Sequence, residues 1–378
     1  MPPVPPWGCS RPSAGSERRR SGTTSNVTTR AEHIATLRPG YQQDLASGTG
    51  RFFEPRQEVC PWCGSNRLRE RLRTTDLLQH KPGTFVIDRC LTCGHHFQNP
   101  RLSEQGLEFY YRDCYDGIGR EHAEKLLGAS GSRQHHRAAA ESMRHLVDPE
   151  RWLDVGTGYG YFPEAARQVF PKTTFHGLDQ GEGVTFAEAE GRIDQALRGL
   201  FTHLAPSRAG QYDVVSMHHY LEHTPDPRAE LRAARTALAP GGLLQIEVPD
   251  PESAYSRMLG RWWLPWFQPQ HLHLMPCRNL REALGDAGFT VVNVERRVPH
   301  RPVDLAAAVA LRLSHLMPRD DAPWHPRPPS TTARRVRKLA RTGGLPAVVA
   351  AYALDLSFGP VARRTSFSNA YRLLARRG

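Results

Sequence analysis

Four cysteines fall into two pairs whose spacing is typical of metal binding. Two residues separate Cys60 from Cys63 and Cys90 from Cys93, and residues 64–89 lie between the pairs. A glycine directly follows each pair, so the backbone can turn tightly and its amides can face the sulfurs. Four soft thiolates leave no open coordination position, which favours a closed, structural zinc site. The alternatives are two exposed redox pairs or coincidence, and the paired glycines argue against coincidence.

A second candidate site begins at a glycine-rich turn. The apolar segment 151–155 leads directly into Gly156, Gly158 and Gly160. Glycines at such a turn allow positive φ and let the backbone approach a ligand closely. Asp179 ends the next strand-like segment, where a carboxylate can accept both hydroxyls of a ribose. The pattern predicts a nucleoside-cofactor site, and the alternative is a glycine turn with a surface aspartate.

Acid and base candidates follow a later apolar segment, YDVVSM. His219, Glu222 and His223 come directly after it. Histidine titrates near neutral pH, so it can remove a proton from a bound ligand. In an open α/β sheet, side chains that follow a strand lie at the ligand-binding edge. Glu222 and His223 therefore have two interpretations: catalytic or ligand-orienting groups, or ordinary residues at the start of the next helix.

The long segment after the last parallel strand supplies further candidates. His271 and His273 lie in the sequence PQHLH, and we expect one of them to face a bound ligand. The segment is too long and too apolar for a simple connector. Its large aromatic side chains predict either the wall of a ligand pocket or ordinary loop packing: Trp262, Trp263, Trp266 and Phe267.

The remaining histidines and cysteines receive no chemical role. His95 and His96 follow the last cysteine pair; they could replace a cysteine as ligand, but the simpler assignment places them at the surface. The pair at 135–136 is expected on a solvated helix face. Cysteines without a partner at ligand spacing are assigned no function: Cys9, Cys114 and Cys277.

Helix-like and strand-like segments that could position these residues alternate from about residue 133 onward. Short apolar runs predict strands at 151–155, 173–179, 212–217 and 243–248. Apolar strands separated by helices indicate a parallel sheet that is covered on both faces. The predicted fold class is therefore α/β with a Rossmann-like sheet.

Four segments together resemble successive signature segments of class I S-adenosylmethionine-dependent methyltransferases: LDVGTGYG, FHGLD, YDVVSMHHYLEH and LAPGGLLQIEVPD. The resemblance covers about residues 133–296 and the strand-like end at 368–376. It implies a seven-stranded sheet whose last strand is antiparallel, with residues 300–365 inserted before that strand. A cysteine module ahead of such a domain also resembles sugar C-methyltransferases and related small-molecule enzymes.

The resemblance also implies how the cofactor is held. Gly156, Gly158 and Gly160 would pass under the amino-acid end of S-adenosylmethionine. Asp154 would lie near the cofactor's ammonium group, and Asp179 would bind its ribose. A dinucleotide-binding sequence would more often carry the pattern G-x-G-x-x-G.

One motif after the fourth predicted strand resembles a metal cluster. The spacing of His219, Glu222 and His223 is similar to the Glu-x-x-Glu-His cluster of some ubiquinone-type O-methyltransferases. Histidine stands here in the first position, where that cluster has glutamate. A divalent ion at this motif is therefore left open.

Composition sets the domain organisation and excludes some classes. The chain has 378 residues, 39% of them hydrophobic, which is enough for two or three units with a substantial core. We expect a disordered leader at 1–50, a zinc-ribbon module at 51–110, and a methyltransferase domain at 120–378 with a helical insertion at 300–365. Residues 1–30 lack the apolar core of a signal peptide, which predicts a cytoplasmic protein.

Charge concentrates near the C-terminus. Residues 290–378 carry 16 Lys and Arg against 5 Asp and Glu, nearly all of the net charge of +12. The stretch RRVRKLARTGG has two interpretations, a solvated helix face or a contact with nucleic acid or an anionic membrane surface. No uninterrupted apolar stretch reaches the length of a spanning helix, so we expect no transmembrane segment.

These inferences combine into one functional hypothesis. The chain would transfer a methyl group from S-adenosylmethionine to an oxygen or carbon of a sugar or natural-product intermediate, with His223 or His271 as base. One alternative is an RNA methyltransferase that uses the zinc ribbon and basic region to bind nucleic acid. The other is a catalytically silent cofactor-binding scaffold. The sequence leaves the oligomeric state open.

Overall fold

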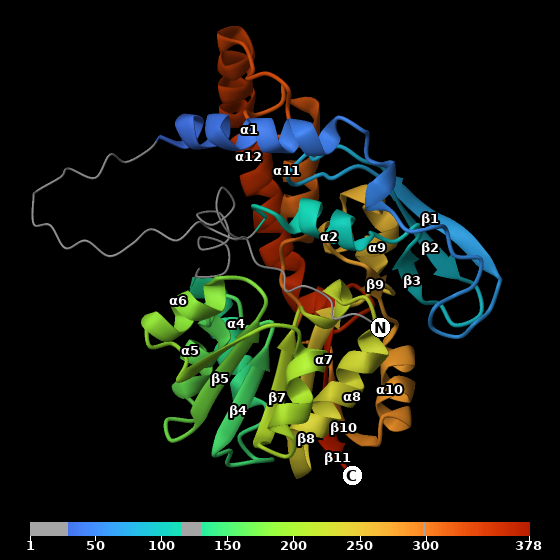
Figure 1. Ribbon diagram of the computed structural model, residues 1–378, viewed down its shortest axis with the longest axis vertical. Helices are drawn as coiled ribbons and strands as arrows, with labels where there is room; N and C mark the ends of the chain where they lie inside the picture. The colour runs from blue at the N-terminus through green and yellow to red at the C-terminus, as the bar shows by residue number, and fades with distance from the viewer. Residues whose placement is uncertain (1–28, 115–129, 298) are drawn as a thin grey trace, which may run out of the picture.

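The computed structural model describes residues 29–114, 130–297 and 299–378, and its centre is a seven-stranded sheet (Figure 1). The strand order is β10-β11-β8-β7-β4-β5-β6. Strand β11 runs antiparallel to both of its neighbours, and the other adjacent pairs from β8 to β6 are parallel. The predicted fold class and antiparallel last strand are confirmed. The strands are β4 (Arg151–Val155), β5 (Thr174–Asp179), β6 (Gln195–Arg198), β7 (Tyr212–His218), β8 (Leu238–Pro249), β10 (Phe289–Glu295) and β11 (Ala370–Arg377).

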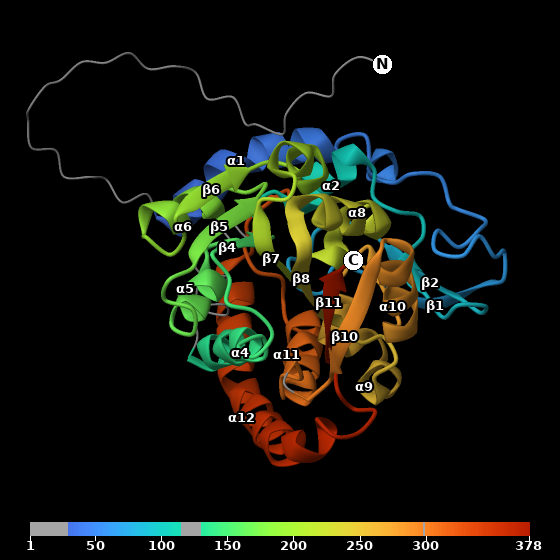
Figure 2. The ribbon, with the colours of Figure 1, turned by 90° about the horizontal axis from the view of Figure 1, so that it is seen from below.

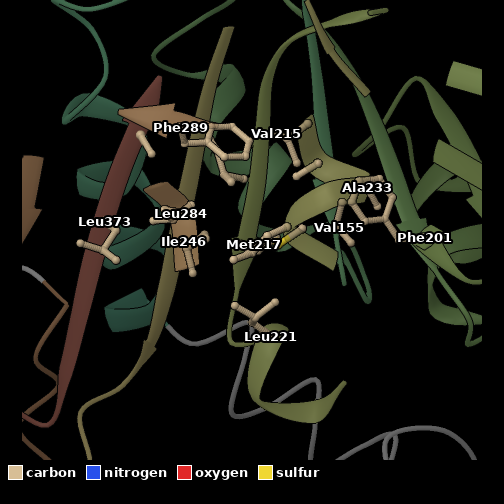
Figure 3. Close-up of a cluster of buried hydrophobic side chains, with 14 of the residues drawn as sticks. Val155, Phe201, Val215, Met217, Leu221, Ala233, Ile246, Leu284, Phe289 and Leu373 are labelled. Carbon is tan, nitrogen blue, oxygen red and sulfur yellow. The ribbon is translucent and has the colours of Figure 1, made fainter. Parts of the chain in front are cut away.

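Helices cover both faces of this sheet (Figure 2). On one face, Phe201, Ala233 and Leu284 pack against side chains of the strands in the larger apolar cluster (Figure 3). On the other face, Ala139 and Phe162 pack against strand residues in a second cluster. The first face is covered by α7 (Phe201–Leu204), α8 (Pro227–Ala237) and α10 (Cys277–Asp286), and the second by α4 (Ser130–Glu141) and α5 (Tyr161–Arg167).

Strand β4 shows why the apolar residues of these strands follow one another instead of alternating with polar residues. Trp152 points into one apolar cluster, whereas Leu153 and Val155 point into the other. Both faces of a parallel sheet are buried, so apolar residues occupy both sides of the strand. The strand then ends where the glycine turn begins.

The cysteine pairs belong to a second, four-stranded sheet with the order β1-β2-β3-β9. Strand β9 comes from the long segment after β8 and pairs antiparallel with β3. The predicted module at 51–110 therefore does not complete its own sheet, because its last strand is supplied by the segment that follows β8. The strands are β1 (Leu68–Thr74), β2 (Phe85–Cys90), β3 (His96–Gln98) and β9 (His273–Leu274).

The expected disordered leader is wrong for its second half. Residues 1–28 lie outside the described residues, but α1 spans Arg30–Leu45. Thr29 forms a capping box with Glu32, and Tyr41 is buried against Phe109 and Trp324. This aromatic anchor comes from distant segments, which the local composition does not reveal. The helix is followed by η1 (Gly50–Phe52), and α2 spans Glu104–Tyr111.

Two helices occupy the predicted insertion between β10 and β11: α11 (Asp304–Leu316) and α12 (Thr331–Ala362). On length and composition, α12 is apolar enough to cross a membrane, with 22% of its most apolar window buried. The expectation of no transmembrane segment therefore stays a prediction. Shorter elements complete the fold: α6 (Gly183–Ala189), α9 (Ala254–Met258), η3 (Ala205–Arg208), η4 (Leu221–His223), η5 (Gly260–Trp262) and η6 (Leu264–Trp266).

Ile246, fully buried on β8, provides a test of this core (Figure 3). Ile246→Ala removes packed methyl groups and leaves a cavity, so we expect the free energy of unfolding to fall by about 2–5 kcal/mol. The matched change Val292→Ala, on a side chain that is 42% exposed on edge strand β10, should cost about 1 kcal/mol or less. Urea titration followed by circular dichroism measures both, and equal losses would contradict the assigned core.

Candidate functional site

The four cysteines converge as predicted. The Sγ atoms of Cys60 and Cys93 lie 3.8 Å apart, and those of Cys63 and Cys90 lie 3.6 Å apart. All four sulfurs lie within 4.8 Å of one another. Tetrahedral zinc with bonds of about 2.3 Å separates its sulfurs by about 3.8 Å, so this cluster is consistent with a zinc site.

Glycines shape both turns of this cluster in the same way. Gly64 and Gly94 have φ values of 71° and 76°, and their amides donate to the carbonyls of Cys60 and Cys90. L-residues rarely adopt this conformation, which explains why glycine follows each cysteine pair.

The histidines beside the cluster are buried, which corrects the expected surface position. His95 is fully buried, and its Nε2 lies 3.0 Å from Nδ1 of His273. His96 is 5% exposed and packs near Trp266. Both are shielded by strands β3 and β9 and the segment before β9, which only the tertiary structure brings together. His273 thus joins the two sheets, and its other ring nitrogen lies 3.4 Å from the carbonyl of Pro225.

The glycine turn after β4 has the strained conformation that its sequence indicates. The φ angles of Gly156, Gly158 and Gly160 are 75°, 51° and 73°. A Cβ at Gly156 would lie 2.6 Å from the Tyr220 ring, and one at Gly160 would lie 2.9 Å from Ala187. A Cβ at Gly158 would meet no protein atom within 4 Å. The middle glycine therefore leaves open space beside the turn.

The two predicted carboxylates lie on either side of this turn. Asp179 accepts hydrogen bonds from the amides of Gly158, at 3.0 Å, and Gly181, at 2.8 Å. Asp154 is 3% exposed and accepts a hydrogen bond from Ser216 at 2.6 Å. Asp179 thus sets the shape of the turn, while Asp154 is held at the end of β4 next to β7.

A second group forms at the ends of β7 and the loop before β9. Glu222, His223 and His271 place one ligand atom each within 4.8 Å of one another. Glu222 is fully buried, and its Oε2 has no hydrogen-bond partner among the described residues. Nδ1 of His223 lies 3.1 Å from the carbonyl of Gln270, and Nδ1 of His271 lies 2.8 Å from that of Pro265. Each neutral ring then carries its lone pair on Nε2.

This donor set is compatible with two uses. Two imidazole nitrogens and one carboxylate can bind a divalent transition metal, and the unpartnered Oε2 of Glu222 fits that possibility. The same groups can accept and stabilise a proton. His271 takes the place in this group that the sequence spacing gave to His219.

His219 instead bridges two carboxylates. Its Nδ1 donates to Oε1 of Glu222 at 3.1 Å, and its Nε2 lies 3.5 Å from Oε1 of Glu247. Loss of solvent opposes its charge, but the two carboxylates outweigh that effect and raise the pKa of His219 to about 9. His219 is therefore a cation near neutral pH and does not supply a lone pair.

Burial and neighbouring charges determine the protonation states of Glu222, His223 and His271. Burial alone would raise the pKa of Glu222, but the hydrogen bond and positive charge of His219 hold it below its usual value. Burial lowers the pKa of His223, and it lowers the pKa of His271 to about 3. An ionised carboxylate therefore lies beside two neutral imidazoles at pH 7.

Sequence reasoning missed Glu247, which organises the same edge. Its carboxylate is fully buried and lies 2.6 Å from Nε2 of His135 and 2.6 Å from Nη2 of Arg372. His135 is thus not on a solvated helix face as expected, because α4 packs against the end of β8. The available signal was a glutamate within the mainly apolar strand LLQIEV.

The aromatic side chains of residues 262–267 include both kinds that the sequence suggested, loop packing and a position beside the candidate site. Trp263 and Trp266 are 1% and 2% exposed and pack in an apolar cluster with Tyr255, which is loop packing. The ring of Phe267 lies 5.0 Å from that of His271, so this side chain borders the Glu222 group. Tyr111 also reaches the group, with its hydroxyl 2.9 Å from Nδ1 of His223.

The sheet order and the glycine turn at the end of β4 define a class I S-adenosylmethionine-dependent methyltransferase domain. Residues 121–294 match a family model described as a methyltransferase domain, which agrees with this assignment.

Curated relatives are similar over the same part of the chain. The chain is 29% identical over 138 residues to the ubiquinone biosynthesis O-methyltransferase of Bordetella avium (strain 197N), covering 32% of this chain and 53% of that protein. It is 35% identical over 129 residues to the protein of that name from Acinetobacter baumannii (strain AYE), covering 32% and 54%. The chain thus spans about half the length of the curated relatives it matches.

A solved structure aligns over more of the chain. A crystallised SAM-dependent methyltransferase from Archaeoglobus fulgidus aligns with 68% of this chain and 99% of its own, at 18% identity and a TM-score of 0.43.

The cysteine cluster predicts stoichiometric zinc in the purified protein. Cys63→Ser removes one thiolate from a closed site, so we expect bound zinc to fall and the module to lose stability. Plasma mass spectrometry measures the metal. Cys114→Ser, outside the cluster, serves as control and should retain zinc; full zinc in Cys63→Ser would contradict the assigned ligands.

The open side of Gly158 predicts a steric test of cofactor binding. Gly158→Ala places a methyl group in the space beside the turn, and we expect calorimetry to show about tenfold weaker binding of S-adenosylhomocysteine or more. Gly210 has a φ of 67° and equally open surroundings, so Gly210→Ala carries the same backbone strain elsewhere. Equal affinity of the two variants would refute a cofactor role for Gly158.

Proposed function

We propose that the chain transfers a methyl group from S-adenosylmethionine to an oxygen or carbon of a small-molecule acceptor. The supporting observation is the position of the Glu222, His223 and His271 group. It follows β7, the immediate neighbour of β4, whose end carries the glycine turn. The carboxyl ends of parallel strands meet at one edge, where open α/β sheets bind ligands.

The cofactor supplies a methyl group on a positively charged sulfur, which a nucleophile displaces in line. In this chain, the glycine turn would hold the amino-acid end of the cofactor, with Asp154 near its ammonium group. Asp179 would bind the ribose hydroxyls. These residues fit that role because both carboxylates flank the turn and Gly158 leaves space beside it.

His223 is the better placed of the two candidate bases. Its Nδ1 faces the carbonyl of Gln270, so its Nε2 is free to accept the acceptor's proton. The pKa of His271 lies too low for efficient proton transfer near neutral pH. As the acceptor forms its bond to the methyl carbon, its proton would pass to Nε2 of His223.

Glu222 would stabilise the resulting imidazolium. It is ionised, fully buried and adjacent to His223, so its charge acts in a medium of low polarity. His219 holds one oxygen of that carboxylate and leaves the other without a partner. The arrangement orients the base and offsets its developing charge.

The names of the relatives and the aromatic side chains beside the candidate base support a small-molecule acceptor. The curated relatives are named for ubiquinone biosynthesis and O-methylation, and Phe267 and Tyr111 provide aromatic surface beside the candidate base. We therefore favour a hydroxyl acceptor on a ring or a similarly apolar scaffold. Screening metabolite extracts with methyl-labelled S-adenosylmethionine would identify it.

Replacement of His223 is expected to lower the activity by a defined amount. His223→Ala should lower kcat by about 10²–10⁴-fold and leave the affinity for S-adenosylhomocysteine unchanged. His145→Ala, on an exposed histidine, is the matched control and should keep both. Methyl transfer to the identified acceptor and calorimetry measure the two quantities; unchanged kcat would remove His223 from the mechanism.

The same base predicts the pH dependence. A base works only when unprotonated, so activity should be complete at pH 7 and fall as the pH drops through the His223 pKa, below the ordinary 6.5. Glu222→Gln removes the charge that favours the imidazolium, so the acid limb should move to lower pH. An acid limb above 6.5, or one that Glu222→Gln leaves in place, would count against this assignment.

A further inference from the structure

Helix α12 exposes a continuous apolar face. Leu345, Val349, Tyr352 and Leu356 follow a spacing of four, three and four residues, which places them on one side of a helix. Their exposed fractions are 58%, 58%, 45% and 50%. Eight of the seventeen large apolar residues that are exposed in the described part of the chain belong to this helix. An exposed apolar surface of this extent marks an interaction site.

The helix cannot turn this face inward, because the side of the helix next to the face is fixed to the fold. The buried carboxylate of Asp355 accepts hydrogen bonds from the amides of Leu305 and Ala306, at the first turn of α11. Gly359 packs against Pro302 and Gly344 against Leu313. These contacts hold the apolar face toward solvent.

Cations flank the apolar face at both ends. Arg334, Lys338 and Arg341 precede it on the same side of the helix, and Arg363 follows it. The only acidic residue within α12 is Asp355, which is buried. Among the described residues, no carboxylate forms an ion pair with Lys338 or Arg341. The exposed side of α12 is thus apolar in its second half and positively charged at both ends.

We propose that this side of α12 docks on the surface of a lipid bilayer that contains anionic headgroups. Cations beside an apolar helix face match the two layers of such a surface, because headgroup phosphates are negative and the acyl boundary is apolar. Docking of this side on the same side of a second copy of the chain would leave these cations without partners, because α12 exposes no carboxylate.

The fold also favours docking on the surface over crossing the bilayer. Strand β11 begins at Ala370, close after the helix ends at Ala362, and lies inside the main sheet between β10 and β8. Crossing would require α12 to leave α11 and would expose Asp355. Surface docking uses the helix as it stands and needs no rearrangement.

Flotation with the full chain tests this proposal. Vesicles of phosphatidylcholine with phosphatidylglycerol should carry the protein upward, whereas vesicles of phosphatidylcholine alone should bind it much more weakly. Lys338→Gln with Arg341→Gln should weaken binding by about 30-fold, since each cation near an anionic surface contributes a factor of about five. Leu345→Ser with Val349→Ser should weaken it by about tenfold or more.

Matched variants separate this surface from general charge or misfolding. Arg278→Gln with Arg281→Gln removes two exposed cations from α10, and Met258→Ser removes an exposed apolar side chain from α9; both should bind vesicles like the unmodified chain. Circular dichroism confirms folding of each variant. Absence of vesicle binding, equal binding to both lipid compositions, or loss of binding only in the α10 variant would overturn the proposal. A dimer in light scattering that disappears in the Leu345 and Val349 variant would overturn it in favour of self-association.

Discussion

The buried carboxylate of Glu247 is the interaction on which the carboxyl edge of the sheet depends. A charge inside a protein must be compensated, and removal of one member of a buried ion pair costs about 3–5 kcal/mol. His135 from α4, Arg372 from β11 and His219 after β7 all turn toward this carboxylate. His219 connects Glu247 to Glu222, because its other ring nitrogen donates a hydrogen bond to the Glu222 carboxylate. One buried charge therefore links strand β11, helix α4 and the candidate base.

Backbone hydrogen bonds also connect the cysteine module to the carboxyl edge of the main sheet. The amide of Leu272 donates to the carbonyl of Glu222, and the carbonyl of Leu272 accepts from the amide of Gln98 on β3. Leu272 lies between His271 and β9, so the pairing of β9 with β3 fixes the loop that carries His271. The sheet that adjoins the four-cysteine cluster thus supports the candidate site although the cysteines themselves take no part in its chemistry.

The sequence predicted the structure correctly wherever that structure is formed by residues close to one another in the chain. The four-cysteine spacing, the glycine turn and the continuous apolar strands each depend on residues close in sequence, so their geometry followed from the residue types. The leader, the surface position of His95 and the solvated position of His135 were predicted wrongly. Each is decided by a partner at least eighty residues away or on another element: Trp324 for α1, His273 for His95 and Glu247 for His135.

The sequence by itself determined the α/β class, the order of the strands along the chain, the glycine turn and the four-cysteine cluster, because periodicity and backbone conformation are local properties. It could not determine which histidine completes the group of Glu222 and His223. Spacing favoured His219, but the side chain of His219 turns between two carboxylates and His271 arrives from a loop that another sheet holds in place. Only the tertiary structure decides between the two histidines. A buried charge is compensated by residues that are close in space, and these residues have no fixed spacing in the sequence.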